Sequence, residues 1–451
     1  MCIRDRYLPK PRWRVRVATF VGDVADRAEE WLIYVTSSGE IRNIRHEVPE
    51  ARPGASLEES AARQLAVAAV NDRFHLDAAR GQVKEVSAKP QKQKARTDWT
   101  FTYTDATLAP LPQGEPRIDV DLAGDEIASV ARYIYVPEEW ERQQRAASTR
   151  NVVIQIAVAV VFGGLLLAAA IGGMVSWSRG RYTPRLFLAA AALVLAASAV
   201  DIANGWPTVV AGLSTSAPLP IQLLGILAVG VIGLSLLAAV VGLAIGALPH
   251  RLAALGTMPD RDALRLGIAV GLFGAAAGVL AGWLRAPAWA QFPPVGSLGS
   301  VVPLLAEAID PIAGFLTRMA VVTATLLTID RITRSWTRRQ AAGLLALGVV
   351  GFLSAGVPVS AHAGGWALAG VIIAVAFAIA YATLLRFDIT LVPVALGTMM
   401  AVGTLSRGAE RPFPGALPGS IVAALLIAVL AWWWFGALRR AGRGLAVGSK
   451  Q

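Results

Sequence analysis

Apolar residues follow one another in long runs after residue 150, and short arginine-containing connections separate these runs. A helix needs roughly 20 apolar residues to cross about 30 Å of hydrocarbon. The pattern therefore predicts an α-helical polytopic membrane bundle of about nine spans within residues 151–451. The nine segments, of which the eighth is the shortest, are 152–176, 186–206, 220–247, 265–284, 311–329, 341–358, 366–385, 389–405 and 420–438.

Before residue 150 the pattern changes to alternating apolar and polar positions, which is typical of strands with one wet face. "PRWRVRVATF" (11–20) and residues 30–49, with a Ser-Gly turn signal, predict the first strands, and four more strand-like segments follow between residues 81 and 137. Between the two groups, residues 54–74 predict a helix. We expect Ser56 to cap this helix together with Glu59, three residues on.

The buried stripe of this helix is expected at one face. Its predicted members are Leu57, Ala61, Leu65, Ala68 and Ala69. A helix followed by antiparallel strands predicts a soluble α+β domain over residues 8–150, in an order that resembles a PepSY or cystatin-like module. The first residues, "MCIRDRY", resemble translated sequencing adapter, so we predict that residues 1–7 are a non-native start.

Charge is distributed unevenly between these two parts. The membrane half holds 19 of the 42 basic residues but only 8 of the 31 acidic ones, so the whole formal charge of +11 belongs to it. Odd-numbered connections and the tail carry 15 Lys and Arg, whereas the even-numbered ones carry only Arg285, Arg407 and Arg411. By the positive-inside rule we expect a bacterial inner-membrane protein with a cytoplasmic C-terminus and an extracytoplasmic soluble domain.

An exported domain needs a signal ahead of it, so we expect a further hydrophobic segment upstream in the complete gene. Arginines placed between apolar runs fit topology better than nucleic-acid binding, and we predict no nucleic-acid partner. The partners expected are the lipid bilayer and a peptide or protein ligand at the outer domain.

Metal and disulfide chemistry has little support in the sequence. Cys2 is the only cysteine and there are four histidines, so we predict no metal site and no cofactor. His46 and His75 have no Cys or Asp at a useful spacing, which predicts surface or packing roles. The basic run of Lys92, Lys94 and Arg96 predicts a solvated hairpin loop.

Small residues recur four apart in "LGIAVGLFGAAAGVLAG", which favours close helix packing within the bundle. The glycine pairs are Gly267/Gly271, Gly274/Gly278 and Gly278/Gly282. "WWWF" (432–435) predicts an aromatic anchor at the membrane interface.

The stretch "AEAIDPIAGFLTR" (306–318) carries the notable charges of the membrane half. Asp310-Pro311 predicts a helix start, because Asp can accept from free amides and Pro is favoured at the first helical position. Arg318 would then lie about 12 Å into the helix, where an arginine pairs with an acid or lines a wet cavity.

On the expected topology, six polar residues gather in the outer leaflet. They are Asp201, Asn204, Glu307, Asp310, Arg318 and His362. Three alternatives stay open for this cluster: a structural ion-pair knot, in particular a pair of Asp201 with Arg318, a binding cavity, or a proton-linked site.

The block "WRVRV…GEIRNIRHEVPEARPGASLEESAARQLA…RTDWTFTYTD…RIDVDLAGDEIASVARYIYVPEEWER", followed by a multi-span region, resembles bacterial intramembrane endopeptidases of the CAAX-protease and bacteriocin-processing (CPBP) type with an extracytoplasmic N-terminal domain. The resemblance covers about residues 7–200. It implies a catalytic Glu-Glu pair with a nearby Arg and two helix-borne histidines, which would activate a water for peptide hydrolysis.

Those catalytic motifs do not occur after residue 150, since the chain's Glu-Glu pairs are Glu29-Glu30, Glu58-Glu59 and Glu138-Glu139. No catalytic residue is therefore assigned. The leading hypothesis is a non-catalytic or degenerate relative that acts as sensor or scaffold through its outer domain. The alternatives are a divergent intramembrane protease, with Glu307, Asp310 or His362 as candidates, and a transporter.

Overall fold

The computed structural model describes the greater part of the chain. The described residues are 7, 13–20, 28–36, 38–108, 111, 114–248, 258–285, 296–334, 336–356 and 363–448. The expected non-native start, apart from Tyr7, and His362 lie outside them. The chain divides into two compact units, residues 1–146 with 211–228 and residues 147–210 with 229–451.

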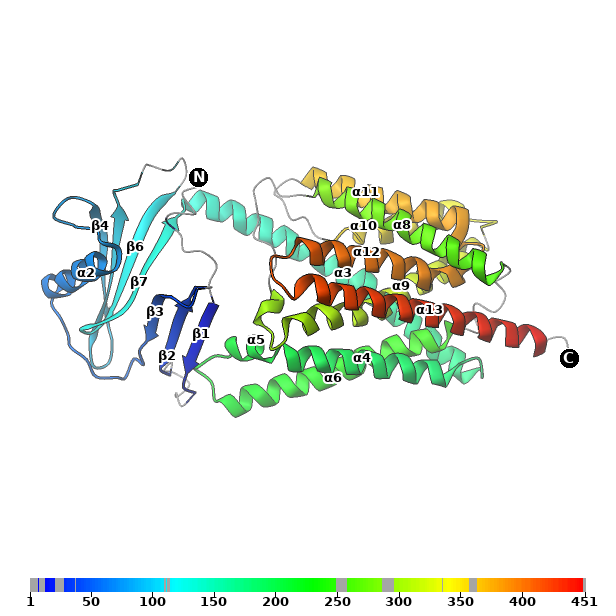
Figure 1. The fold of residues 1–451 in the computed structure, drawn as a ribbon, viewed down its shortest axis with the longest axis horizontal. Helices are drawn as coiled ribbons and strands as arrows, with labels where there is room; N and C mark the ends of the chain where they lie inside the picture. The colour runs from blue at the N-terminus through cyan, green and yellow to red at the C-terminus, as the bar shows by residue number, and fades with distance from the viewer. Residues whose placement is uncertain are drawn as a thin grey trace. The chain divides into compact units, whose positions relative to one another are not determined.

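The first unit contains two separate antiparallel sheets (Figure 1). The smaller sheet has the order β1-β2-β3. Its strands are β1 (Trp13–Ala18), β2 (Glu30–Val35) and β3 (Ile41–Glu47). The larger sheet is a meander, β4-β5-β6-β7. Its strands are β4 (Val83–Lys92), β5 (Thr97–Asp105), β6 (Glu115–Ala123) and β7 (Glu126–Tyr135).

Helix α2 (Glu59–Phe74) packs on the larger sheet. Ala62, Ala66 and Val70 of the helix are fully buried against Phe101 and Ile118 of the strands. Alternation along β6 explains this arrangement, because every second residue of that strand is buried and the others reach the wet face.

The predicted cap of this helix is wrong, and its predicted buried stripe is right in part. The N-cap is Glu58, with no side-chain capping bond, and Ser56 instead forms an isolated bridge with Thr97. Ser56 therefore pairs with the beginning of β5 and does not take part in a capping box. The buried stripe is turned by about one residue, so that Ala69 is buried as predicted but Ala68 is exposed.

The second unit is a bundle of apolar helices, and eight helices of the described residues are long and apolar enough to cross a membrane. The chain is thus a multi-pass membrane protein with a small N-terminal α/β region. These helices are α3 (Glu138–Ser178), α4 (Pro184–Asn204), α6 (Leu219–Gly246), α8 (Asp260–Leu284), α9 (Pro303–Thr333), the helix over Gly364–Leu385, the helix over Ile389–Glu410 and α13 (Ala416–Gly448).

Two of these spans consist of more than one element. Residues Gly364–Leu385 comprise most of α11 (Ala363–Ala380) and a π-helical turn, η2 (Tyr381–Leu385). Residues Ile389–Glu410 comprise a short 3₁₀ turn, η3 (Ile389–Leu391), and α12 (Val392–Glu410). The eighth predicted segment is therefore a full-length span, whereas the sixth is a shorter apolar helix, α10 (Gln340–Leu353).

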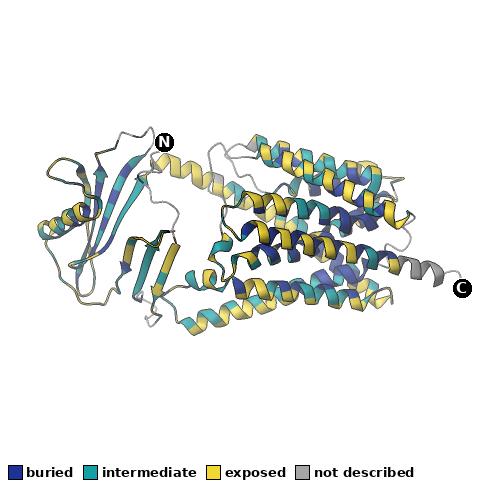
Figure 2. Cartoon of the chain, viewed as in Figure 1, coloured by how far each residue is buried: buried dark blue, intermediate teal, exposed yellow. Residues whose placement is uncertain are grey.

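Helix α9 is the most buried of these helices, whereas α6, much of which is yellow in Figure 2, is largely exposed. Phe315, Leu316 and Met319 are fully buried on its inner face. Leucine, phenylalanine and methionine fill such a core, while lipid-facing positions of other helices keep their apolar side chains exposed.

Glycines bring α8 close to α12. A Cβ on Gly271 would lie 2.5 Å from the carbonyl oxygen of Ala395, and one on Gly267 would lie 2.9 Å from Val394. Gly278 and Gly282 face open space instead. Of the three predicted glycine pairs, only Gly267/Gly271 therefore has a tight contact at both members.

Candidate functional site

Asn204 joins the end of α4 to the beginning of α9. Its side-chain amide donates to the Val302 carbonyl oxygen at 3.0 Å, and its side-chain oxygen accepts from the Val302 amide at 2.8 Å. Asn204 is buried, where polar atoms need hydrogen-bond partners, and Val302 is the partner of both polar atoms of its side chain. Its role is to hold two helix ends at the same level.

Glu307 performs a similar task for α9 and α12. Its buried carboxylate forms an ion pair with Arg411, the residue that ends α12, and accepts a hydrogen bond from Ser297 Oγ at 2.5 Å. The end of α4, the start of α9 and the end of α12 consequently meet at one end of the bundle. A carboxylate held by these two donors is poorly placed to act as a general base.

Asp310 is not a helix start, contrary to the sequence-based prediction. Helix α9 begins seven residues earlier, with Pro303 in its first turn, and Pro311 lies inside the helix. Pro303 supplies the N-terminal proline signal. Pro311 lacks the amide hydrogen that would bond the carbonyl four residues back, so α9 loses one backbone hydrogen bond beside Asp310.

The exposed carboxylates of Asp201 and Asp310 lie close enough to repel each other. No hydrogen bond or ion pair to either one occurs among the described residues. Helices α4 and α9 therefore also lie close at these two residues. The two like charges do not stabilise this contact.

Arg318 lies at the middle of α9 and is exposed. Within the described part of the chain it forms no hydrogen bond and no ion pair, so the pair with Asp201 that one of the three alternatives proposed is not found. The charges that act on it are those of Arg407 on α12, which repels it, and of Asp310, two turns earlier, which attracts it. His362 lies outside the described residues and is not placed with the others.

Arg439 lies at the centre of a buried ionic cluster that was not predicted from the sequence. Arg439 of α13 donates to Asp388 at 2.6 Å, to Asp260 at 2.6 Å and to the carbonyl oxygen of Met258 at 2.9 Å. Asp388 is fully buried and also accepts from the amide and hydroxyl of Thr390. The centre ties α13 to η3 and to the beginning of α8.

Only the acidic residues that contact Arg439 could have indicated this cluster in the sequence. Asp388 and Asp260 are two of the eight acidic residues after residue 150, and each stands beside a predicted span. In the sequence, Arg439 is one of the basic residues that indicate topology, and nothing near it identifies the acid that neutralises it.

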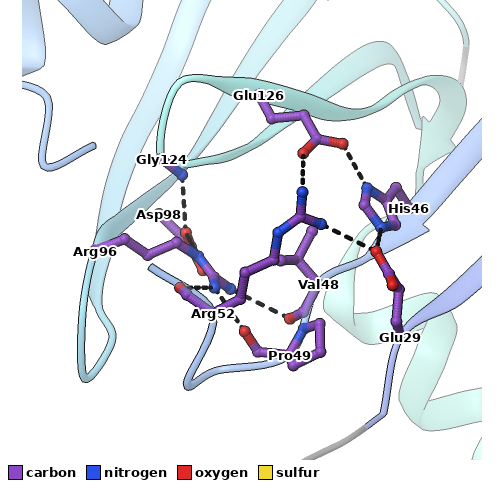
Figure 3. A network of polar contacts seen from close by, with 9 residues as sticks. All are labelled: Glu29, His46, Val48, Pro49, Arg52, Arg96, Asp98, Gly124 and Glu126. Carbon is purple, nitrogen blue, oxygen red and sulfur yellow. Dashed lines mark hydrogen bonds and ion pairs between the residues drawn. The ribbon is translucent and has the colours of Figure 1, made fainter. Parts of the chain in front are cut away.

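His46 connects the two sheets of the first unit (Figure 3). Its Nε2 lies 2.9 Å from Glu29, its Nδ1 contacts Glu126 of β7, and its ring stacks on Trp31 at 3.5 Å between centroids. A neutral imidazole can donate to one of these carboxylates, and a protonated one to both. Arg52 also pairs with Glu29 and lies 3.8 Å from Glu126.

Beside this network, Arg96 lies in the hairpin loop between β4 and β5, as predicted, but its side chain is buried and not solvated. It pairs with Asp98 and donates to the carbonyl oxygens of Val48, Pro49 and Arg52 (Figure 3). Arginine has five donors in a fixed geometry, which suits a turn with several free carbonyls. Lys92 and Lys94 are exposed, as expected.

Among the described residues, no group of three or more His, Cys, Asp or Glu is arranged to hold a metal ion. Comparisons with protein families, with curated proteins and with solved structures found no match for this chain. The polar residues of the bundle thus form two kinds of arrangement. Asn204, Glu307 and Arg439 make structural contacts at the helix ends, and Arg318 lies in an exposed charged region.

Proposed function

We propose that this protein is a multi-pass membrane sensor or scaffold whose extramembrane unit binds a peptide or protein ligand. Such a role would fit a non-catalytic or degenerate relative of the CPBP-type endopeptidases in a bacterial inner membrane, with its soluble unit outside the cytoplasm and its C-terminus inside. Support for the sidedness comes from the arginine distribution. Support against hydrolysis comes from Glu307, whose carboxylate is engaged by Arg411.

One observation carries the binding role: the small sheet has an uncovered apolar face within the described residues. Trp13, Val15 and Val17 of β1 point to the same side and are 49, 47 and 55% exposed. They pair with Val35, Ile33 and Trp31 of β2, which extend the apolar face across the sheet. Contiguous apolar surface of this kind marks interaction sites.

The position of β1 indicates the form of the ligand. In the order β1-β2-β3, β1 is an edge strand, so one side of its backbone pairs with no described strand. An extended peptide can add to such an edge, with main-chain hydrogen bonds for affinity and alternate side chains on the apolar face for specificity. The proposed ligand is therefore an extended segment with alternating apolar residues.

The test uses the full chain in lipid nanodiscs and a fluorescein-labelled peptide of alternating valine and threonine. Fluorescence anisotropy should detect binding, and Val15→Lys should weaken it by about tenfold or more, because burying one valine is worth about 1.5–3 kcal/mol. Val86→Lys is the matched control, since Val86 lies on β4 and is 45% exposed. Equal weakening by both variants, or no binding to the wild-type chain, would contradict the proposal.

A transport function is the second candidate. It is favoured by Pro311 inside α9 next to Asp310, whose carboxylate has no ion-pair partner among the described residues, since interrupted helices with intramembrane acids occur in proton-linked transporters. Proteoliposomes containing a pH-sensitive dye would show proton entry that Asp310→Asn abolishes. Identical dye signals in wild type, variant and protein-free vesicles would exclude it.

A further inference from the structure

Two arginines lie on neighbouring helices of the bundle, α9 and α12. Arg318 of α9 and Arg407 of α12 are both exposed, and their charges lie close enough to repel. Neither forms an ion pair with a described carboxylate. An arginine is costly at the centre of a membrane helix, so two such arginines without an ion-pair partner among the described residues are costlier still.

Helix direction explains why the two side chains converge. Helices α9 and α12 run in opposite directions, because Glu307 near the beginning of α9 pairs with Arg411 at the end of α12. Side chains lean toward the N-terminus of their own helix, so Arg318 leans toward the level of Arg407 and Arg407 leans toward the level of Arg318. The hydrogen bond from Arg407 Nε to the carbonyl oxygen of Gly403, at 3.2 Å, shows this inclination directly.

The depth of the pair follows from the helix rise of 1.5 Å per residue. Arg407 lies four residues, or about 6 Å, below Arg411. Arg318 lies eleven residues, or about 16 Å, below Glu307 on the opposing helix. The guanidinium groups therefore approach one another below the helix ends, within the membrane-spanning part.

Two glycines leave room beside the guanidinium groups. Gly314 and Gly403 stand four residues before Arg318 and Arg407, on the same helix faces, and a Cβ at either position would meet nothing within 4 Å. One turn after Arg318, on the same side of α9, Val321 is buried by neighbouring residues. The open surface thus ends at Arg318.

We propose that Arg318 and Arg407 together bind a phosphate group that enters between α9 and α12. Guanidinium groups bind phosphate oxygens in a bidentate manner, and charge-assisted hydrogen bonds of this kind strengthen in a low-dielectric setting. Asp310, eight residues earlier on α9, attracts Arg318 but forms no ion pair with it, so the guanidinium group keeps its donors for another ligand. The phosphate belongs either to an anionic lipid headgroup or to a soluble phosphate compound.

The test compares wild type, Arg318→Gln and Arg407→Gln as full chains in phosphatidylcholine nanodiscs. One arm adds phosphatidic acid, and native mass spectrometry measures the lipid retained. The other arm adds inorganic phosphate, and the thermal midpoint is measured. Arg331→Gln is the matched control, because it removes the same charge at an exposed position near the end of α9.

We expect each Gln variant to retain about tenfold less of the bound probe than wild type or Arg331→Gln, because each variant loses charged hydrogen-bond donors to the phosphate group. Lipid retention alone identifies a lipid source, and a midpoint shift with phosphate alone identifies a soluble one. Gly314→Leu keeps both charges but fills the open space, and it should lose binding as well. Binding of neither probe, or equal binding by all variants, would overturn the proposal.

Discussion

Replacing Arg439 by methionine should destabilise the bundle more than any other single arginine substitution near the C-terminus. The change removes a buried guanidinium that serves Asp388, Asp260 and the Met258 carbonyl. Methionine keeps most of the side-chain length and the contact with Phe435, over whose ring the guanidinium lies at 5.0 Å. The substitution therefore isolates the ionic contribution.

The size of the effect follows from Asp388, which is fully buried. After the substitution its remaining donors are the amide and hydroxyl of Thr390, and its charge is no longer neutralised. Removing one partner of a buried pair costs about 3–5 kcal/mol. Asp260 adds less, because its side chain is 54% exposed and water can replace the lost contact.

The assay is the free energy of unfolding of the full chain in mixed micelles, followed by circular dichroism during denaturant titration. Arg440→Met is the control, because Arg440 is the exposed neighbour and its loss changes the topology-determining charge equally. We expect a loss of about 3–5 kcal/mol for Arg439→Met and less than about 1 kcal/mol for Arg440→Met. Adding Asp388→Asn to Arg439→Met should recover part of the loss, and equal stability of the two arginine variants would refute the reasoning.

Three further predictions concern helix contacts and pH. Gly271→Ala should cost about 1–3 kcal/mol, because its Cβ would press on the α12 backbone, whereas Gly278→Ala, which faces open space, should be neutral or slightly stabilising in the same assay. Asn204→Ala should lower stability by about 1–3 kcal/mol, because buried backbone groups lose their partners; an unchanged unfolding free energy would contradict this. Arg117 donates to Glu115 and holds its pKa below the usual value, so its stabilisation is present above the ordinary glutamate pKa and is lost as pH falls through the lowered one. Glu115→Gln should therefore flatten the acid side of the plot of thermal midpoint against pH, and an unchanged plot would count against this assignment.

Periodicity alone predicted most of the elements. Every predicted strand region of the soluble part contains a strand, because alternation reflects one wet face. The apolar runs likewise predicted the helices of the bundle, because hydrocarbon requires apolar length. Composition could not predict that residues 13–47 would form a separate sheet, since strand pairing depends on register and contacts distant in sequence.

The charged residues were harder to interpret from sequence. Asp310-Pro311 has the local signature of a helix start, but Pro303 begins the helix earlier and tertiary packing tolerates the inner proline. The sequence near His46 contains no indication of its hydrogen-bond partners, because Glu29 and Glu126 are 17 and 80 residues away. Partners of this kind become visible only when the fold brings distant elements together, as it does for Arg439 and Asp388.

The proposed ligand-binding role of β1 is tested most directly by hydrogen exchange of the full chain in nanodiscs, with and without the alternating valine–threonine peptide. Addition of the peptide should slow amide exchange in residues 13–18 and leave β4, the edge strand of the other sheet, unchanged. Unaltered exchange in residues 13–18 in the presence of bound peptide would contradict the account.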